Sequence, residues 1–353
     1  MKVATVLRWS AATVIVVALT TARLAHRGII ALPGIDTHPG LEAQLRDRGT
    51  MAIAGRVPFG LRKGDVQIVD YHQFGPLAAA LDGRDSNALA AAMRESRIDG
   101  LVVRTDTPQG PAGSVLRALS MYRPVPNVTA TWMDRDAALY EVREQPVVSE
   151  QDAPKLIETV RLMMQGAAAP PERLFPEALR GARPAEVMVV VRDGTAPILW
   201  RAVRGGSVAR ALVDATYAII DRWGTRQQNP YGPLSSAIRG EPEPGRSPPN
   251  LLLTVAIFYD KGTLETREPA WIDRAVDEHS FAVGYERLGR WEYNLPPPTG
   301  ASTRRSAEAL AQLVREHDVP PPGFQRTDLT LYRFRALQLI EQSRGGPVTV
   351  ANP

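Results

Sequence analysis

The first candidate for chemistry is the segment from Ile198 to Ala215, where a strand-like run meets Gly205-Gly206-Ser207 and an alanine-rich helix follows. A phosphate-binding Walker loop needs a lysine directly after its second glycine, and a nucleophile elbow needs a glycine two residues after its serine. The segment meets neither condition. We therefore interpret the two glycines as a turn and Ser207 as the cap of the following helix. The alternative is an anion bound at the helix N-terminus beside Arg204.

The five histidines offer no helical metal motif, because none lies three or four residues from another. His72 is a candidate site residue, since Asp70 could orient its ring. If both residues lie in a strand, however, they only share a face. We interpret His279 and His317, which have acidic neighbours, as solvated. The chain has no cysteine, which excludes thiolate nucleophiles, disulfides and cysteine-ligated metals, and we predict neither metal nor cofactor.

Aromatic residues gather in the second half of the chain, where exposed rings could bind a sugar. The alternation of Phe281, Val283 and Tyr285 is typical of a half-buried strand and favours core packing for most of these rings. Trp291 and Tyr293, which follow the predicted turn, are the candidates for exposed, ligand-binding rings.

Composition limits the class of partner. The chain has 353 residues with 42 basic and 38 acidic side chains, and the two signs are interspersed. A nucleic-acid binder would concentrate its positive charge in one patch, so we expect no nucleic-acid partner. A hydrophobic content of 44% in a chain of this length allows two domains, each with its own core.

The N-terminus is typical of an export signal. Lys2 and Arg8 precede an apolar run that carries no charge until Arg23. Residues 1–28 are therefore a cleaved signal peptide or an uncleaved anchor, with residues 9–25 in the inner membrane. A buried core helix is the remaining alternative. In the first two cases the rest of the chain lies outside the cytoplasm, in the periplasm or secreted.

Periodicity and turn signals divide the rest of the chain and predict the α+β class. We expect a linker over residues 29–40, a small α/β domain over 41–145, an α+β domain over 149–342 and a disordered tail over 343–353. The second domain should contain a hairpin turned at Asp193-Gly194, a helix from Ser207 to Trp223 and a strand starting at Leu251. A second hairpin turned at Gly289, a helix from Ser302 or Ser306 and a final strand from Asp328 should follow.

This order of elements resembles the AMMECR1 domain family over about residues 185–340. The matching features are a strand, glycine turn and helix over Leu199–Ile220, an apolar strand over Leu251–Tyr259 and a Pro-rich break ending at Pro322. The family tends to close on a strand like the one formed here by Asp328 and Leu331–Phe334, "DLTLYRF". The resemblance implies a fold more than a function, because the family has no established reaction.

Two departures from the family matter. Its Leu-Arg-Gly-Cys-Ile-Gly signature is replaced here by "LWRAVRGGS", and its members are typically intracellular. In the first domain, "DYHQFGP" and "AALYEVR" resemble the soluble domains of membrane glycosyltransferases that use lipid-linked sugars. Because no multi-span region accompanies them, this resemblance implies an accessory domain and not a transferase.

Two functional hypotheses follow from these patterns. The first is a non-catalytic protein of a bacterial-type cell envelope that binds an envelope protein or a glycan. The second is an envelope hydrolase or transferase that uses carboxylates and His72 or His279, and it requires two acidic residues in one cleft, one with a raised pKa.

Overall fold

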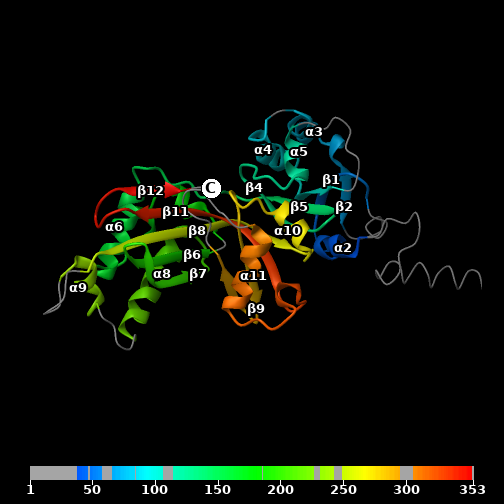
Figure 1. Cartoon of the computed structure of the whole chain (residues 1–353). Helices are drawn as coiled ribbons and strands as arrows, with labels where there is room; N and C mark the ends of the chain where they lie inside the picture. The colour runs from blue at the N-terminus through cyan, green and yellow to red at the C-terminus, as the bar shows by residue number, and fades with distance from the viewer. Residues whose placement is uncertain are drawn as a thin grey trace, which may run out of the picture. The chain divides into compact units, whose positions relative to one another are not determined.

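The computed structural model describes residues 38–46, 48–57, 66–83, 85–105, 114–184, 186–225, 231–241, 249–294 and 305–351. The signal or anchor predicted for residues 1–28 lies outside these ranges. Within them, ten α-helices and twelve β-strands form a mixed α/β architecture, consistent with the predicted α+β class (Figure 1). No helix in the described part of the chain has both the length and the apolar character needed to cross a membrane.

Contacts within the chain gather into two compact units. Of the described residues, unit 1 comprises those up to Val125 together with Ala130–Val142, and unit 2 comprises Pro126–Thr129 and those from Arg143 onward. The domain ranges 41–145 and 149–342 stay predictions, because compactness alone does not show that either unit folds independently.

The sheet of unit 1 combines parallel and antiparallel pairings. Its strands are β1 (Thr50–Ala54), β2 (Gln67–Asp70), β3 (Gly100–Arg104), β4 (Val128–Met133) and β5 (Ala137–Val142). β1 pairs in parallel with β2 and β3, while β5 runs antiparallel to β3 and lies next to β4. Between and after the parallel strands lie α3 (Gly75–Asp82), α4 (Ala88–Glu95) and α5 (Ser114–Ser120). A tight turn at Asp134 joins β4 to β5, where the backbone N–H of Asp134 donates to the Ala137 carbonyl at 2.9 Å.

Helix α2 (Pro39–Leu45) begins inside the segment predicted as a linker. His38 caps it, because the ring Nδ1 accepts a hydrogen bond of 3.2 Å from the backbone N–H of Leu41. Proline suits the start of a helix, where its missing N–H has no partner to lose. The linker prediction is therefore wrong at residues 39 and 40, and residues 29–37 lie outside the described ranges.

The strands of unit 2 form antiparallel pairs around two long members. They are β6 (Glu186–Asp193), β7 (Ala196–Val203), β8 (Leu251–Leu264), β9 (Ala282–Arg287), β10 (Arg290–Tyr293), β11 (Thr330–Glu341) and β12 (Val348–Ala351). β8 pairs with β11; β6 and then β7 extend the sheet beyond β8, and β9 and then β10 extend it beyond β11. The disordered tail predicted over 343–353 is wrong for β12, which pairs with Gln338–Glu341.

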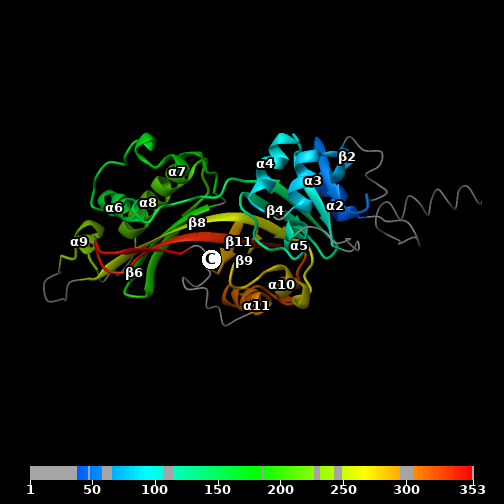
Figure 2. The ribbon, with the colours of Figure 1, turned by 90° about the horizontal axis from the view of Figure 1, so that it is seen from above.

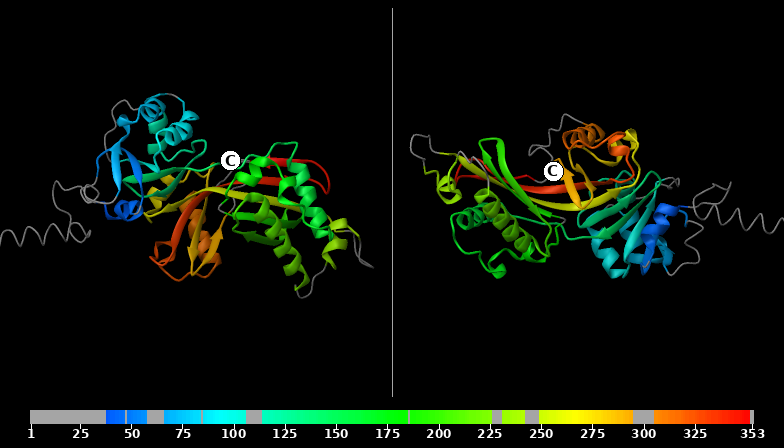
Figure 3. Two further views of the ribbon diagram at one scale, coloured as in Figure 1. Left: turned by 180° about the vertical axis from the view of Figure 1, so that it is seen from behind. Right: turned by 90° about the horizontal axis from the view of Figure 1, so that it is seen from below.

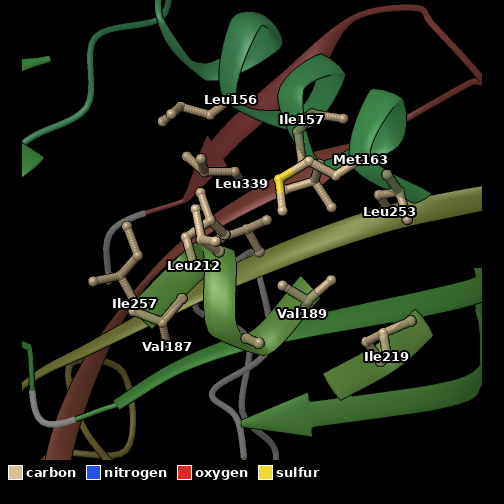
Figure 4. Packing of buried hydrophobic residues seen from close by; sticks show 14 of the residues in the cluster. Leu156, Ile157, Met163, Val187, Val189, Leu212, Ile219, Leu253, Ile257 and Leu339 are labelled. Atoms are coloured by element: carbon tan, nitrogen blue, oxygen red, sulfur yellow. The ribbon is translucent and has the colours of Figure 1, made fainter. Parts of the chain in front are cut away.

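The main core of unit 2 lies between its sheet and two helices, α6 (Ala153–Met164) and α8 (Val208–Gly224). Every second residue of β6 and β8 points into it, as the strand period requires. Figure 4 labels members from five elements: Leu156, Ile157, Met163, Val187, Val189, Leu212, Ile219, Leu253, Ile257 and Leu339. Fully burying one such side chain stabilises the fold by about 1.5–3 kcal/mol.

The remaining helices of unit 2 lie around this frame. They are α7 (Glu177–Gly181), α9 (Leu234–Arg239), α10 (Pro269–Ala275) and α11 (Ser306–Glu316). Figure 2 shows α6 and α8 on one side of β8 and β11, and α10 and α11 on the other side. Figure 3 shows the same separation from below. Helix α11 contacts β9 and β10 and so supports the edge of the sheet that these two strands form.

Candidate functional site

The Gly-Gly-Ser segment is a structural turn. Ser207 caps α8, because its Oγ accepts a hydrogen bond of 3.2 Å from the backbone N–H of Arg210. The same hydroxyl donates to the Glu172 carboxylate, which places a negative charge where an anion would have to bind. A Cβ on Gly205 would lie 2.7 Å from the Ala211 Cβ, so this glycine allows close approach of the chain to the helix. The helix-cap interpretation is confirmed.

His72 is not in a strand, so the expectation that it shares a strand face with Asp70 is wrong. It lies in the short 3₁₀ helix Tyr71–Gln73, where Asp70 Oδ1 accepts the His72 backbone N–H at 2.9 Å. The same oxygen is 2.7 Å from His72 Nδ1, and the imidazole is 63% exposed. Asp70 therefore caps a turn, and the pair lies on the surface of unit 1, where no other described titratable group is bonded to the ring.

The other three candidate residues are brought together on the face of the unit 2 sheet that is opposite the α6–α8 core. We define the sheet-face cluster as seven side chains contributed by β6, the end of β7, β8, β9, β10 and β11. Its members are Glu186, Arg204, Lys261, Glu286, Trp291, Tyr293 and Tyr332. They surround an aromatic floor that includes Phe258 and Phe334, whose ring centroids are 5.1 Å apart.

Cross-strand register explains why β9, β10 and β11 bring these groups together. Trp291 lies directly opposite Glu286, and Tyr293 lies opposite Gly284. Gly284 is also opposite Tyr332 on the other neighbouring strand. Residues directly opposite in adjacent strands project to the same face. A Cβ on Gly284 would lie 2.9 Å from Tyr293 Cβ and 3.2 Å from Trp291 Nε1, so the missing side chain leaves room for both rings.

A β-bulge in β8 aims Lys261 at this cluster. Gly262 lies opposite Arg333, but Tyr259 lies opposite Arg335, so β8 contains one residue more than β11 over this step. Asp260, inside the bulge, has a φ of 53°. An extra residue reverses the alternation of side chains. Lys261 therefore reaches the same aromatic rings as the even-numbered residues that precede it in β8.

Lys261 is a cation held against aromatic rings. Its Nζ lies 4.1 Å from the centroid of the Trp291 ring and 3.9 Å from that of Tyr332. Among the described residues, no hydrogen bond or ion pair satisfies this ammonium group. Burial lowers the pKa of Lys261 to about 8, and the charge of Arg204 acts in the same direction. The negative charges of Glu286 and Glu186 act in the opposite direction and raise the pKa of Lys261.

Glu186 is the matching buried acid. It is 8% exposed, and its Oε2 has no hydrogen-bond partner in the described part of the chain. Burial raises the pKa of Glu186 to about 7, although the positive charges of Arg204 and Lys261 act to lower it. Near neutral pH this carboxyl can therefore hold or release a proton. A buried acid and a partly buried base with shifted pKa values in one cluster are typical of a functional site.

Glu286 is the satisfied carboxylate of the cluster. Its Oε2 lies 3.4 Å from Arg204 Nη2 and accepts a hydrogen bond of the same length from the Tyr332 hydroxyl. The Arg204 side chain is 50% exposed, so most of its donors face solvent. This pair forms the solvent-facing rim of the cluster.

The two aromatic candidates behave differently from each other. The prediction that Trp291 is exposed is wrong, because it is 8% exposed and packs edge-on against Phe258. Its Nε1 is buried and has no acceptor among the described residues. Tyr293 is half-buried and lies 6.1 Å, centroid to centroid, from Trp200. Trp200 is the exposed ring, at 42%.

Sequence reasoning missed Glu186, Lys261, Glu286 and Tyr332. One signal was present: Lys261 follows another charged residue, Asp260, in a mainly apolar strand that continues to Leu264. The others stand at ordinary solvent-facing positions of a strand pattern. Only the pairing of the four strands β6, β8, β11 and β9 shows that these residues face one another.

A depression of about 490 Å³ lies beside α6, away from the sheet-face cluster. It is lined by Asp152, Lys155, Leu156, Thr159, Pro170, Leu174, Phe175 and Pro176. Its two charged groups are paired, since Lys155 Nζ is 3.1 Å from Asp152 Oδ1. No group of three or more histidine and acidic side chains in the described residues could hold a metal ion. The sheet-face cluster is therefore the better candidate.

Comparison with known proteins identifies no family. No protein-family model matches the chain, and no curated protein matches it. One solved structure, that of the uncharacterized protein PH0010 from Pyrococcus horikoshii, is similar at 16% identity and a TM-score of 0.44. The match covers 58% of this chain and 99% of that one. A match this distant carries no argument about function.

Proposed function

We propose that this chain is an exported protein of a bacterial-type cell envelope that binds a partner or glycan without converting it. One observation carries the proposal: the sheet-face cluster gathers polar atoms that lack partners beside an exposed ring. Buried polar atoms are normally satisfied in folded proteins, and a ligand is one way to satisfy them. The signal-like N-terminus supports the envelope location.

A glycan fits the chemistry of this face. Trp200 and Tyr293 offer an apolar surface at the rim, on which the C–H face of a sugar ring can pack. Arg204 and Glu286 lie beside them and provide donors and acceptors for hydroxyl groups. Binding sites commonly combine aromatic surface with a few convergent polar groups in this way.

The test is binding of purified chain to peptidoglycan fragments and other envelope glycans, followed by tryptophan fluorescence and calorimetry. We expect Trp200→Ala to weaken binding at least tenfold. Tyr217→Ala, an equally exposed aromatic on α8, is the matched control and should bind normally. Binding to none of the glycans and to no envelope protein would refute the proposal, as would release of a product.

A second candidate is a hydrolase or transferase, favoured by the raised pKa of Glu186 beside a second carboxylate, Glu286. In such an enzyme Glu186 would donate a proton to the leaving group, as the acid of a glycosidase does. Glu186→Gln would then abolish product release from a cell-wall substrate while leaving binding intact. Binding with no product from the unchanged chain favours the first proposal.

Further parts of the proposal concern the chain as a whole. We place an AMMECR1-like domain at about residues 185–340, which the predicted hairpins, helices and closing strand support by occurring in the predicted order. We place a glycosyltransferase-like accessory domain before it and a signal peptide or anchor at residues 1–28. Cell fractionation with intact-mass measurement tests the last point: a mature species starting near Arg23 means cleavage, and full-length protein in the membrane fraction means an anchor.

A further inference from the structure

We infer that the sheet-face cluster contains a subsite for an oxyanion, a carboxylate or a phosphate carried by the ligand, formed by Lys261 and Arg204 against the ring of Trp291. This inference specifies the ligand chemistry of the binding function proposed above and rests on it. Lys261 lies in β8, Arg204 directly follows β7 and Trp291 lies in β10, so the paired sheet positions the subsite and no loop closure is needed.

The donors of this subsite exceed its acceptors. Lys261 offers three N–H donors, and no described residue accepts from them. The Nη2 of Arg204 donates a hydrogen bond of 3.4 Å to the Glu286 carboxylate, and the other N–H groups of Arg204 can donate to a ligand. The ring faces against Lys261 stabilise its charge, but they supply no conventional hydrogen-bond acceptor.

The positions of Arg204 and Lys261 also favour binding of a single ligand group by both. The Arg204 guanidinium carbon is 5.7 Å from the Trp291 ring centroid, and Lys261 Nζ is 4.1 Å from the same centroid. Both cations therefore lie against one indole. An oxyanion has several lone pairs and can accept from converging donors, and hydrogen bonds between charged groups are the strong ones.

The two glutamates of the cluster do not prevent an oxyanion from binding at the subsite. Glu286 is engaged by Arg204 and by the Tyr332 hydroxyl. Glu186 has a pKa raised to about 7 by burial, so a bound anion would favour its protonated form, which adds a donor. A metal cation is disfavoured because Lys261 and Arg204 would repel it. A neutral ligand would add no negative charge beside Lys261 and Arg204.

The experiment compares three sugars of one skeleton on the full chain: glucuronate, glucose 6-phosphate and glucose. Dissociation constants come from tryptophan fluorescence and calorimetry. We expect at least one acidic sugar to bind tenfold or more tightly than glucose. A preference for glucuronate identifies a carboxylate ligand, and a preference for glucose 6-phosphate identifies a phosphate.

Substitutions test whether this subsite causes the preference for an acidic sugar over glucose. Lys261→Met keeps most of the side-chain stem and should remove the preference, whereas Lys155→Met, an exposed lysine on α6, should keep it. Arg204→Gln, at a half-exposed position, should reduce the preference even if Lys261→Met folds poorly. Equal binding of the acids and glucose overturns the subsite but leaves the proposed binding function standing. Absence of binding by all three sugars overturns the subsite, and the glycan panel then decides the binding function separately.

Discussion

Glu186→Gln should make the protein more stable at alkaline pH. Burial raises the pKa of Glu186 from its ordinary value of 4.5 to about 7, so the folded chain holds the proton more tightly than the unfolded chain does. Above pH 4.5 the Glu186 carboxyl ionises more readily in the unfolded chain than in the folded chain. The stability of the wild type therefore falls with rising pH until the folded carboxyl also ionises near pH 7. Glutamine cannot ionise and avoids this loss.

The size of the effect follows from the two pKa values. Since a difference of one in pKa is worth about 1.36 kcal/mol, the loss reaches roughly 3 kcal/mol at pH 8 and stays below about 1 kcal/mol at pH 5. Glutamine has its own packing cost, but that cost is the same at both pH values. The change between pH 5 and pH 8 in the stability difference between variant and wild type should therefore be roughly 2–3 kcal/mol.

The assay is urea unfolding of both proteins at pH 5 and pH 8, followed by tryptophan fluorescence and circular dichroism. Glu158→Gln, an exposed glutamate on α6, is the control and should show no such pH-dependent difference. A stability difference that is equal at both pH values would refute the reasoning, because it would mean that Glu186 ionises normally in the folded state.

Three further predictions concern stability. Glu341→Gln should cost about 3–5 kcal/mol in thermal or urea unfolding, because it leaves Arg161, bonded to Glu341 at 2.5 Å, as an uncompensated buried charge. Ser207→Ala should cost about 1 kcal/mol in the same measurement, because the N-terminus of α8 loses its cap. Burial lowers the pKa of His38, but its bond to Asp134 outweighs this and the pKa is raised above 6.5. Relative to His38→Asn, the wild type should therefore lose stability as pH rises from 6.5 through the folded pKa, measured as melting temperature between pH 5.5 and 8.5.

Each of these predictions has an outcome that contradicts it. Glu241→Gln removes an exposed partner of Arg239 and should leave the melting temperature unchanged, so a loss equal to that of Glu341→Gln would argue against a special role for burial. Unchanged stability of Ser207→Ala would show that the cap is dispensable. A melting-temperature difference between His38→Asn and wild type that does not vary with pH would show that the histidine does not titrate in this range.

Much of the fold was predictable because its signals are local. The apolar run of β8, the turn residues Asp193-Gly194 and Leu288-Gly289, and the cap at Ser207 each act within a few residues. Gly194 and Gly289 have φ values of 57° and 76°, a conformation that glycine adopts without strain. The elements missed were short: α2 depends on a histidine cap, and β12 depends on pairing with β11.

The candidate site was only partly predictable. Arg204, Trp291 and Tyr293 were selected one at a time, for a glycine turn and for aromatic character, and nothing in the sequence linked them. Trp291 shows the limit, because strand alternation assigns it a face and cannot say whether that face is covered. Its exposure of 8% depends on rings from β8, β10 and β11 that lie far apart in the chain.

By itself, the sequence determined the absence of cysteine chemistry, the signal-like start, the order of strands and helices in the second half, and the roles of single turn and cap residues. These depend on composition or on neighbours along the chain. Only the tertiary structure decided that Glu186, Arg204, Lys261 and Trp291 form one cluster. The reason is physical: strand register and the bulge at Asp260 set which residues face one another, and burial at that place shifts the pKa values of Glu186 and Lys261 toward neutrality.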